Sequence, residues 1–154
     1  MSTFVHVHHL LVADPNPAIR NLLRAVFDPE RFRLSFAADG EMALGLALID
    51  PPEILLTEMR LNGLDGASLA ESLKDHPRTK GVRVLVLTTA AGEWDRQRAR
   101  SAGVDGYITK PFSPAHLLRV VDRLLADFGE MEPGSRLAKV KPDIGGQLRS
   151  SRPW

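Results

Sequence analysis

Residues 53–66 carry a carboxylate at a position suited to chemistry. The stretch opens with the apolar run 54–56, which is typical of a buried strand. The strand pattern ends at Glu58, and turn signals follow at Asn62-Gly63 and Asp65-Gly66 before a helical pattern begins. Open α/β sheets place their ligand sites at the carboxyl ends of buried strands. Glu58 is therefore the first candidate functional residue.

The rest of the chain predicts the elements that position this carboxylate. Strands are expected at 9–13, 32–37, 54–57, 83–88 and 105–109. Helices are expected at 17–27, 41–49, 67–74, 92–102 and 113–128, with Asn16 and Ser113 as N-caps. Because connections are short and most strands are continuously apolar, we expect an α/β fold with a parallel sheet covered on both faces.

Composition bounds the class of protein. The chain has 154 residues, a usual size for one domain, and its net charge of +1 indicates no nucleic-acid partner. It contains no cysteine, which excludes disulfides and thiolate chemistry and fits a cytoplasmic protein. No apolar run approaches the roughly 18 residues of a membrane helix. The first ten residues hold no lysine or arginine, so they make a poor signal peptide.

The ends of the chain differ in character from its centre. We expect a lead-in at 1–8, a domain at 9–128 and a flexible tail at 129–154, which is rich in Gly, Pro, Ser and charged residues. Trp154 is either a plain chain end or a docking residue. His6, His8 and His9 indicate either a metal-binding tract or a lead-in followed by the start of a strand.

Residues 53–66 resemble the phosphoacceptor region of the receiver domain of bacterial two-component response regulators. In that family an Asp ends the third strand, and an Asp-Gly pair follows seven and eight residues later. Here Asp65-Gly66 points back to Glu58. The block 102–112 matches as well, and the resemblance covers about residues 9–128. It implies a doubly wound, flavodoxin-like three-layer sandwich with strand order 2-1-3-4-5, an order for which a receiver protein is itself a standard example.

The resemblance also implies a Mg²⁺ site, and this sequence departs from it twice. The family's metal ligands are two acids after the first strand, the acceptor Asp and a backbone carbonyl two residues later, which is that of Arg60 here. Asp14 keeps one acid, but Pro15 replaces its neighbour, and aligning Asp14 as the second acid leaves Ala13 as the first. We therefore expect Mg²⁺ binding by Asp14 and Glu58 to be weak or absent.

Glu58 replaces the acceptor Asp itself. Its carboxylate reaches roughly 1.5 Å further than that of Asp, about one C–C bond. Misplacement of about 1 Å can cost 10²-fold in rate, so we expect poor phosphoryl transfer. The longer side chain also places negative charge where phosphoryl oxygens would lie, and could partly hold the switched-on shape. The alternative is a solvated carboxylate at a strand end.

The family's signal-transmitting residues are present. Thr88 matches the hydroxyl that hydrogen-bonds the phosphoryl group, Tyr107 the aromatic switch, and Lys110 the cation that pairs with the acceptor. The resemblance implies a cis bond between Lys110 and Pro111. Arg60 offers a further hypothesis, in which its guanidinium folds onto Glu58 and Asp14 and supplies the charge that Mg²⁺ normally supplies.

The sequence therefore predicts an atypical receiver that acts as a protein-interaction module without phosphorylation. It is not expected to be an enzyme, and its partner is a histidine kinase or a downstream signalling protein. In the family the output face comprises the segments here at 92–102, 105–109 and 113–128, through which a second copy could also bind. Trp94 is the candidate contact residue there, unless it folds back onto its own helix. The alternatives are a conventional Mg²⁺-dependent phosphoryl acceptor and an enzyme on a similar fold, for which no motif is present.

Overall fold

The computed structural model describes residues 6–130, apart from the side chains of 128–130. Five strands alternate with five helices in this part of the chain. The strands are β1 (His8–Ala13), β2 (Phe32–Ala37), β3 (Ile54–Thr57), β4 (Arg83–Thr88) and β5 (Gly106–Thr109). The helices are α1 (Pro17–Val26), α2 (Gly40–Ile49), α3 (Gly66–Asp75), α4 (Glu93–Ser101) and α5 (Pro114–Glu130). The predicted elements are all confirmed, and their ends differ from the predictions by at most two residues.

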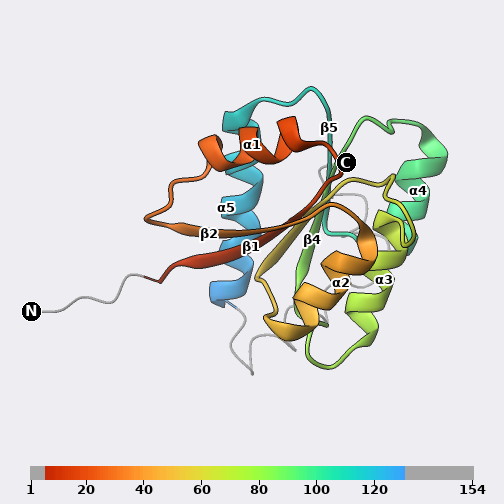
Figure 1. Ribbon diagram of the computed structural model, residues 1–154, viewed down its shortest axis with the longest axis horizontal. Helices are drawn as coiled ribbons and strands as arrows, with labels where there is room; N and C mark the ends of the chain where they lie inside the picture. The colour runs from red at the N-terminus through yellow and green to blue at the C-terminus, as the bar shows by residue number, and fades with distance from the viewer. Residues whose placement is uncertain (1–5, 131–154) are drawn as a thin grey trace, which may run out of the picture.

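The strands form one parallel sheet in the order β2-β1-β3-β4-β5 (Figure 1). This is the predicted flavodoxin-like topology. Strands β1, β3 and β4 lie inside the sheet, and nearly all their side chains are buried, which explains their continuous apolar sequences. β2 lies at an edge and is only half-buried, so its sequence alternates instead.

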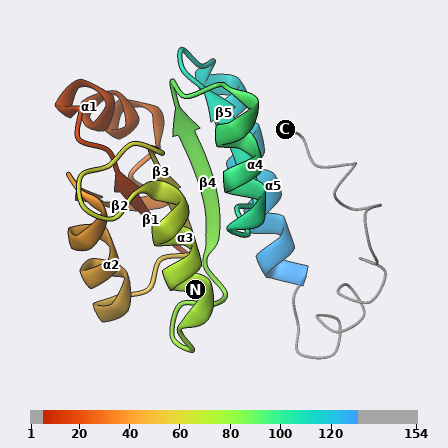
Figure 2. The ribbon, with the colours of Figure 1, turned by 90° about the vertical axis from the view of Figure 1, so that its right-hand side faces the viewer.

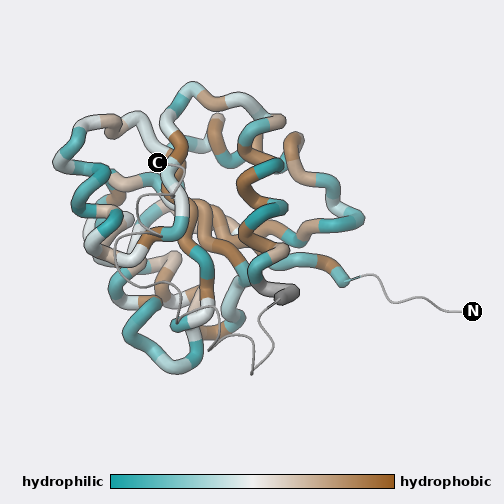
Figure 3. The backbone as a smooth tube through the Cα atoms, turned by 180° about the vertical axis from the view of Figure 1, so that it is seen from behind, coloured by the Kyte–Doolittle hydropathy of each residue, from teal (hydrophilic) through white to brown (hydrophobic). Residues whose placement is uncertain are grey.

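Helices cover both faces of the sheet and form three layers. Leu10 and Val12 of β1 point to the core shared with α1 and α5, whereas Leu11 and Ala13 point to the core shared with α2, α3 and α4. Figure 1 shows α1 and α5 on one side of the sheet and α2, α3 and α4 on the other, and Figure 2 shows the molecule from the side of α3 and α4. Figure 3 shows hydrophobic residues concentrated in the central strands. The sheet is therefore a rigid base whose carboxyl ends stay free for a site.

The Asp65-Gly66 pair has a structural reason for its spacing from Glu58. Asp65 caps α3, since its Oδ1 accepts a hydrogen bond of 2.8 Å from the backbone N–H of Ser68. A Cβ on Gly66 would lie 2.4 Å from the carbonyl oxygen of Glu58, so only glycine fits there. The pair therefore brings the start of α3 against the end of β3.

Both predicted N-caps are confirmed by hydrogen bonds. The Asn16 side chain accepts from the N–H of Ala18 at 2.9 Å, and that of Ser113 accepts from the N–H of His116 at 3.2 Å. The described residues leave out 1–5 and 131–154. Most of the predicted tail, with Trp154, falls in the second of these ranges. Within 6–130, no helix is both long and apolar enough to span a bilayer.

Candidate functional site

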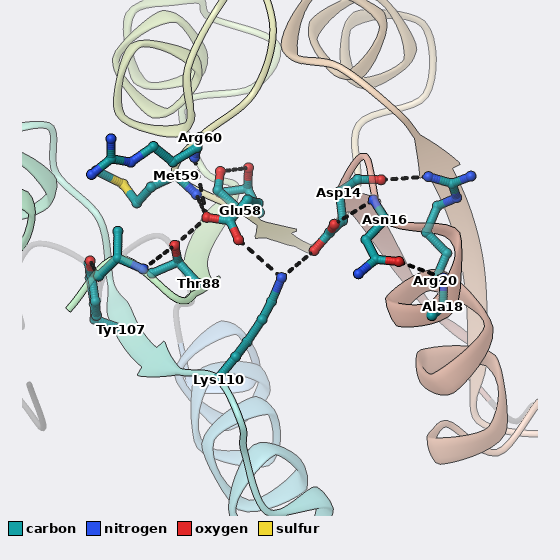
Figure 4. A network of polar contacts seen from close by, with 12 residues as sticks. Asp14, Asn16, Ala18, Arg20, Glu58, Met59, Arg60, Thr88, Tyr107 and Lys110 are labelled. Atoms are coloured by element: carbon teal, nitrogen blue, oxygen red, sulfur yellow. Dashed lines mark hydrogen bonds and ion pairs between the residues drawn. The ribbon is translucent and has the colours of Figure 1, made fainter.

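Four predicted site residues converge at the carboxyl edge of the sheet. Asp14 follows β1, Glu58 follows β3, Thr88 ends β4 and Lys110 follows β5 (Figure 4). Adjacent parallel strands bring their carboxyl ends to the same edge, so side chains far apart in sequence meet there. A cleft of about 480 Å³ opens beside them; it is lined by Asp14, Pro15, Asn16, Ile19, Glu58, Arg60, Thr89, Lys110 and Pro111.

Lys110 bridges the two carboxylates of this cleft. Its Nζ donates to Asp14 Oδ2 at 2.8 Å and to Glu58 Oε1 at 3.0 Å. All three side chains are nearly buried, at 11%, 5% and 8% exposure for Lys110, Asp14 and Glu58. Burial alone would lower the pKa of Lys110, but the hydrogen bonds to Asp14 and Glu58 outweigh it and raise that pKa. The lysine is therefore a fixed positive charge between two anions.

The second oxygen of Glu58 is also fully engaged. Oε2 accepts from the N–H of Met59 at 2.6 Å, from the N–H of Arg60 at 3.2 Å and from the hydroxyl of Thr88. Burial would raise the pKa of Glu58, but the hydrogen bonds from Thr88 and Lys110 overcome it and hold the pKa below its ordinary value. Glu58 is thus an ionised, oriented carboxylate. The alternative that it is a solvated group at a strand end is wrong, since the residue is only 7% exposed.

Asp14 is held by its own turn. Its Oδ1 accepts from the N–H of Asn16 at 2.8 Å, and its backbone oxygen accepts from Arg20 at 2.7 Å. Pro15, beside it, is exposed and offers neither a carboxylate nor an N–H. The first strand therefore contributes one anion to the cleft.

A chain of contacts leads from Glu58 to Tyr107. The Thr88 hydroxyl donates to Glu58 and accepts from the N–H of Ala90 at 3.0 Å. Tyr107 in turn donates its hydroxyl to the carbonyl of Ala90 and is only 6% exposed. Burial and the nearby Asp95 raise the pKa of Tyr107. The ring therefore points inward, with its proton kept.

The guanidinium of Arg60 does not reach the carboxylates, which corrects the expectation that it replaces Mg²⁺. It lies 3.2 and 3.3 Å from the two carboxylate oxygens of Asp95 on α4, and Figure 4 shows it turned away from Glu58. The reason is competition, because hydrogen bonds already occupy both oxygens of Glu58. Lys110 takes the position that the hypothesis gave to Arg60.

Sequence reasoning missed Asp95 and Ala90. Asp95 is 8% exposed and joins α4 to the loop after β3, whereas Ala90 links Thr88 to Tyr107 through its backbone. A backbone contact leaves no residue-type signal, and an Asp in the first turn of a helix is common for capping alone. Trp94, by contrast, was predicted as a contact residue, and it is 72% exposed. The Lys110-Pro111 bond is cis, as expected.

Comparison with known proteins identifies the family. The model of the response regulator receiver domain matches residues 10–122. Response regulator PleD of Caulobacter vibrioides is 34% identical over 115 residues, which are 75% of this chain and 25% of PleD. An "Uncharacterized 14.6 kDa protein in sodA1 3'region" of Leptolyngbya boryana is 31% identical over 119 residues, 77% of this chain and 91% of that protein. This chain thus spans only about a quarter of PleD.

Solved structures agree with this assignment. The receiver domain of the sensor histidine kinase PA1611 from Pseudomonas aeruginosa PAO1, with a magnesium ion coordinated in its active-site cleft, aligns with a TM-score of 0.72. It is 27% identical, and the alignment covers 79% of this chain and 99% of that one. Chemotaxis response regulator CheY4 of Vibrio cholerae shares the fold, with a TM-score of 0.71, 23% identity and coverage of 77% and 99%. From its sheet order, its cleft and these matches, the chain belongs to the response regulator receiver domain family of two-component signalling.

Proposed function

We propose that this receiver domain is a protein-interaction module that signals without phosphorylation of its acceptor position. One observation carries the proposal: the two oxygens of Glu58 hold Lys110 and Thr88 at the same time. In receiver domains, these two positions bind the phosphoryl group of a phosphorylated Asp. Glu58 supplies one negative charge to them, against nearly two for a phosphoryl group.

The contacts beyond Thr88 support a conformation resembling the switched-on one. Thr88 lies against Glu58, and Tyr107 is turned inward onto the Ala90 carbonyl. Receiver domains switch when a charge at the acceptor biases a bistable surface. A permanent carboxylate with the reach of Glu can apply that bias without a kinase.

The donor set of the cleft favours a resident Mg²⁺ ion less than the family pattern does. Mg²⁺ takes an octahedral shell of oxygen ligands, and the only carboxylates among the residues that line the cleft are those of Asp14 and Glu58. Both are paired with the Lys110 ammonium, whose positive charge lies where a cation would compete for them. We therefore expect weak or absent Mg²⁺ binding.

The partners follow from the family. Receiver domains interact with histidine kinases and downstream effectors, and the face of α4, β5 and α5 is the proposed contact surface here. Trp94 stands out from that face with 72% exposure. If a second copy is the partner, Trp94→Ala should abolish self-association in sedimentation experiments. If a kinase or effector is the partner, the wild type and Trp94→Ala should both sediment as monomers.

We place this module in the cytoplasm and expect no enzymatic activity.

Incubation with acetyl phosphate and Mg²⁺, followed by intact mass measurement, tests the proposal. The wild-type chain should gain no phosphoryl group, whereas the double reversion Pro15→Asp/Glu58→Asp should gain one. Glu58→Gln controls for modification elsewhere. A phosphoryl group on the wild-type chain that Glu58→Gln abolishes would establish the conventional acceptor instead. A double reversion that stays unmodified would show that these two substitutions are not what disables the site.

A further inference from the structure

We propose that His6, His8 and Glu53 form a binding site for one divalent transition-metal ion of the zinc class. The structure brings these three side chains together, and their ligand atoms all lie within 4.8 Å of one another. Two imidazoles and one carboxylate are the donors that such metals prefer, and three protein ligands leave a position open for water.

The distances between the donor atoms suit a metal. His6 Nε2 and His8 Nδ1 each lie 3.1 Å from Oε1 of Glu53. Donor atoms about 2.0–2.1 Å from a tetrahedral zinc ion lie roughly 3.3 Å from each other. Two edges of a coordination tetrahedron are therefore present, and the third closes by movement of His6, whose side chain is 69% exposed.

Two of the three ligands stand on rigid backbone. The N–H of Glu53 donates to the carbonyl of His9 at 2.8 Å, and its carbonyl accepts from the N–H of Arg83 at 3.0 Å. His8 begins β1, and its ring packs against Phe32 with a centroid separation of 5.8 Å. Support of this kind orients ligands before a metal arrives.

Strand alternation decides which histidines take part. Side chains two residues apart in an extended chain point the same way, so His6 and His8 face Glu53 together. His9 points to the other face of the sheet, where its Nε2 lies 2.8 Å from the Ser35 hydroxyl. Of the three histidines, only His6 and His8 therefore belong to the site. Their third partner, Glu53, lies 45 residues from His8 in the chain.

The site is separate from the cleft beside Asp14, Glu58 and Lys110, which we call the acceptor cleft. It lies at the amino end of β1, whereas Asp14 follows the carboxyl end, and a strand rises about 3.3 Å per residue. The two sites are thus roughly 20 Å apart. A bound ion would link the segment before β1 to Glu53, the residue that precedes β3.

Titration calorimetry with Zn²⁺ on the full chain, without a polyhistidine tag, tests this site. One equivalent should bind, and His6→Ala and Glu53→Gln should each weaken binding at least tenfold. Because the His6 side chain is mostly exposed, His6→Ala should leave the fold intact. His116→Ala, an exposed histidine elsewhere, is the matched control and should bind like the wild type. Excess Mg²⁺ should not compete, because imidazole ligands favour softer metals.

Three results would overturn the proposal. These are the absence of saturable Zn²⁺ binding, an affinity unchanged by both His6→Ala and Glu53→Gln, and loss of binding in Asp14→Asn, which would place the ion in the acceptor cleft. Thermal unfolding gives a second readout: Zn²⁺ should raise the Tm of the wild type and not that of His6→Ala.

Discussion

Lys110 and Asp14, 96 residues apart in the chain, are joined by an ion pair of 2.8 Å between Nζ and Oδ2. The same ammonium contacts Glu58 at 3.0 Å, so one cation holds the ends of β1, β3 and β5 together. Because the three groups are nearly buried, the attraction is poorly screened by solvent. The cleft therefore contains its own countercharge.

Removing this lysine should be costly. Lys110→Met leaves two buried carboxylates without their cation, and we expect a loss of about 3 kcal/mol in the free energy of unfolding measured by urea denaturation. Lys80→Met, at an exposed lysine, is the matched control and should change stability by less than about 0.5 kcal/mol. Adding Glu58→Gln to Lys110→Met should recover part of the loss. No recovery would contradict the proposed pairing.

Acid should remove a contribution made by Glu58. Since its pKa is held below the ordinary value of 4.5, folding favours the ionised form. That stabilisation is present above pH 4.5 and is lost as the pH falls through the folded-state pKa. The stability advantage of the wild type over Glu58→Gln should therefore shrink below pH 4.5 in urea titrations. Glu30→Gln, on an exposed loop, controls for the loss of a carboxylate elsewhere. A constant advantage down to acid pH would refute the assignment.

Tyr107 is the only tyrosine of the chain, so its ionisation can be followed by phenolate absorbance. Burial and Asp95 raise its pKa, so the midpoint should lie above 10 in the folded chain and near 10 in urea. Stability from this group is present below pH 10 and is lost as the pH rises through the folded-state pKa. Asp95→Asn should lower the midpoint. A native midpoint at or below 10 would mean that the ring is not turned inward.

Two glycines should respond oppositely to alanine. In Gly66→Ala the new Cβ meets the Glu58 carbonyl oxygen at 2.4 Å and Met59 Cα at 3.0 Å, both backbone atoms that cannot rotate away. We expect a loss of about 2–3 kcal/mol. Gly45, exposed in the middle of α2, has nothing within 4 Å of that position. Gly45→Ala should gain about 0.5–1 kcal/mol from helix propensity. Urea denaturation of both variants checks the pair, and equal effects would contradict the packing described here.

Local patterns in the sequence predicted the fold because local physics determines them. Apolar runs, caps at Asn16 and Ser113, and the Asp65-Gly66 pair each act over a few residues, and each leaves a readable signal. Lys110 matched a position of the family, and its contact with Glu58, 52 residues away in the chain, followed from the parallel topology. The residues of the acceptor cleft were therefore nearly all predictable.

The tertiary structure decided which charge meets which. Arg60 could reach several anions by spacing alone, and it pairs with Asp95 because Lys110, Thr88 and two backbone N–H groups already occupy Glu58. The sequence likewise shows His6 and His8 but not the carboxylate beside them. The sequence alone determined the elements and the inventory of chemical groups. Their pairing was decided only in three dimensions, since competition among donors for one buried carboxylate depends on where neighbouring strands place them.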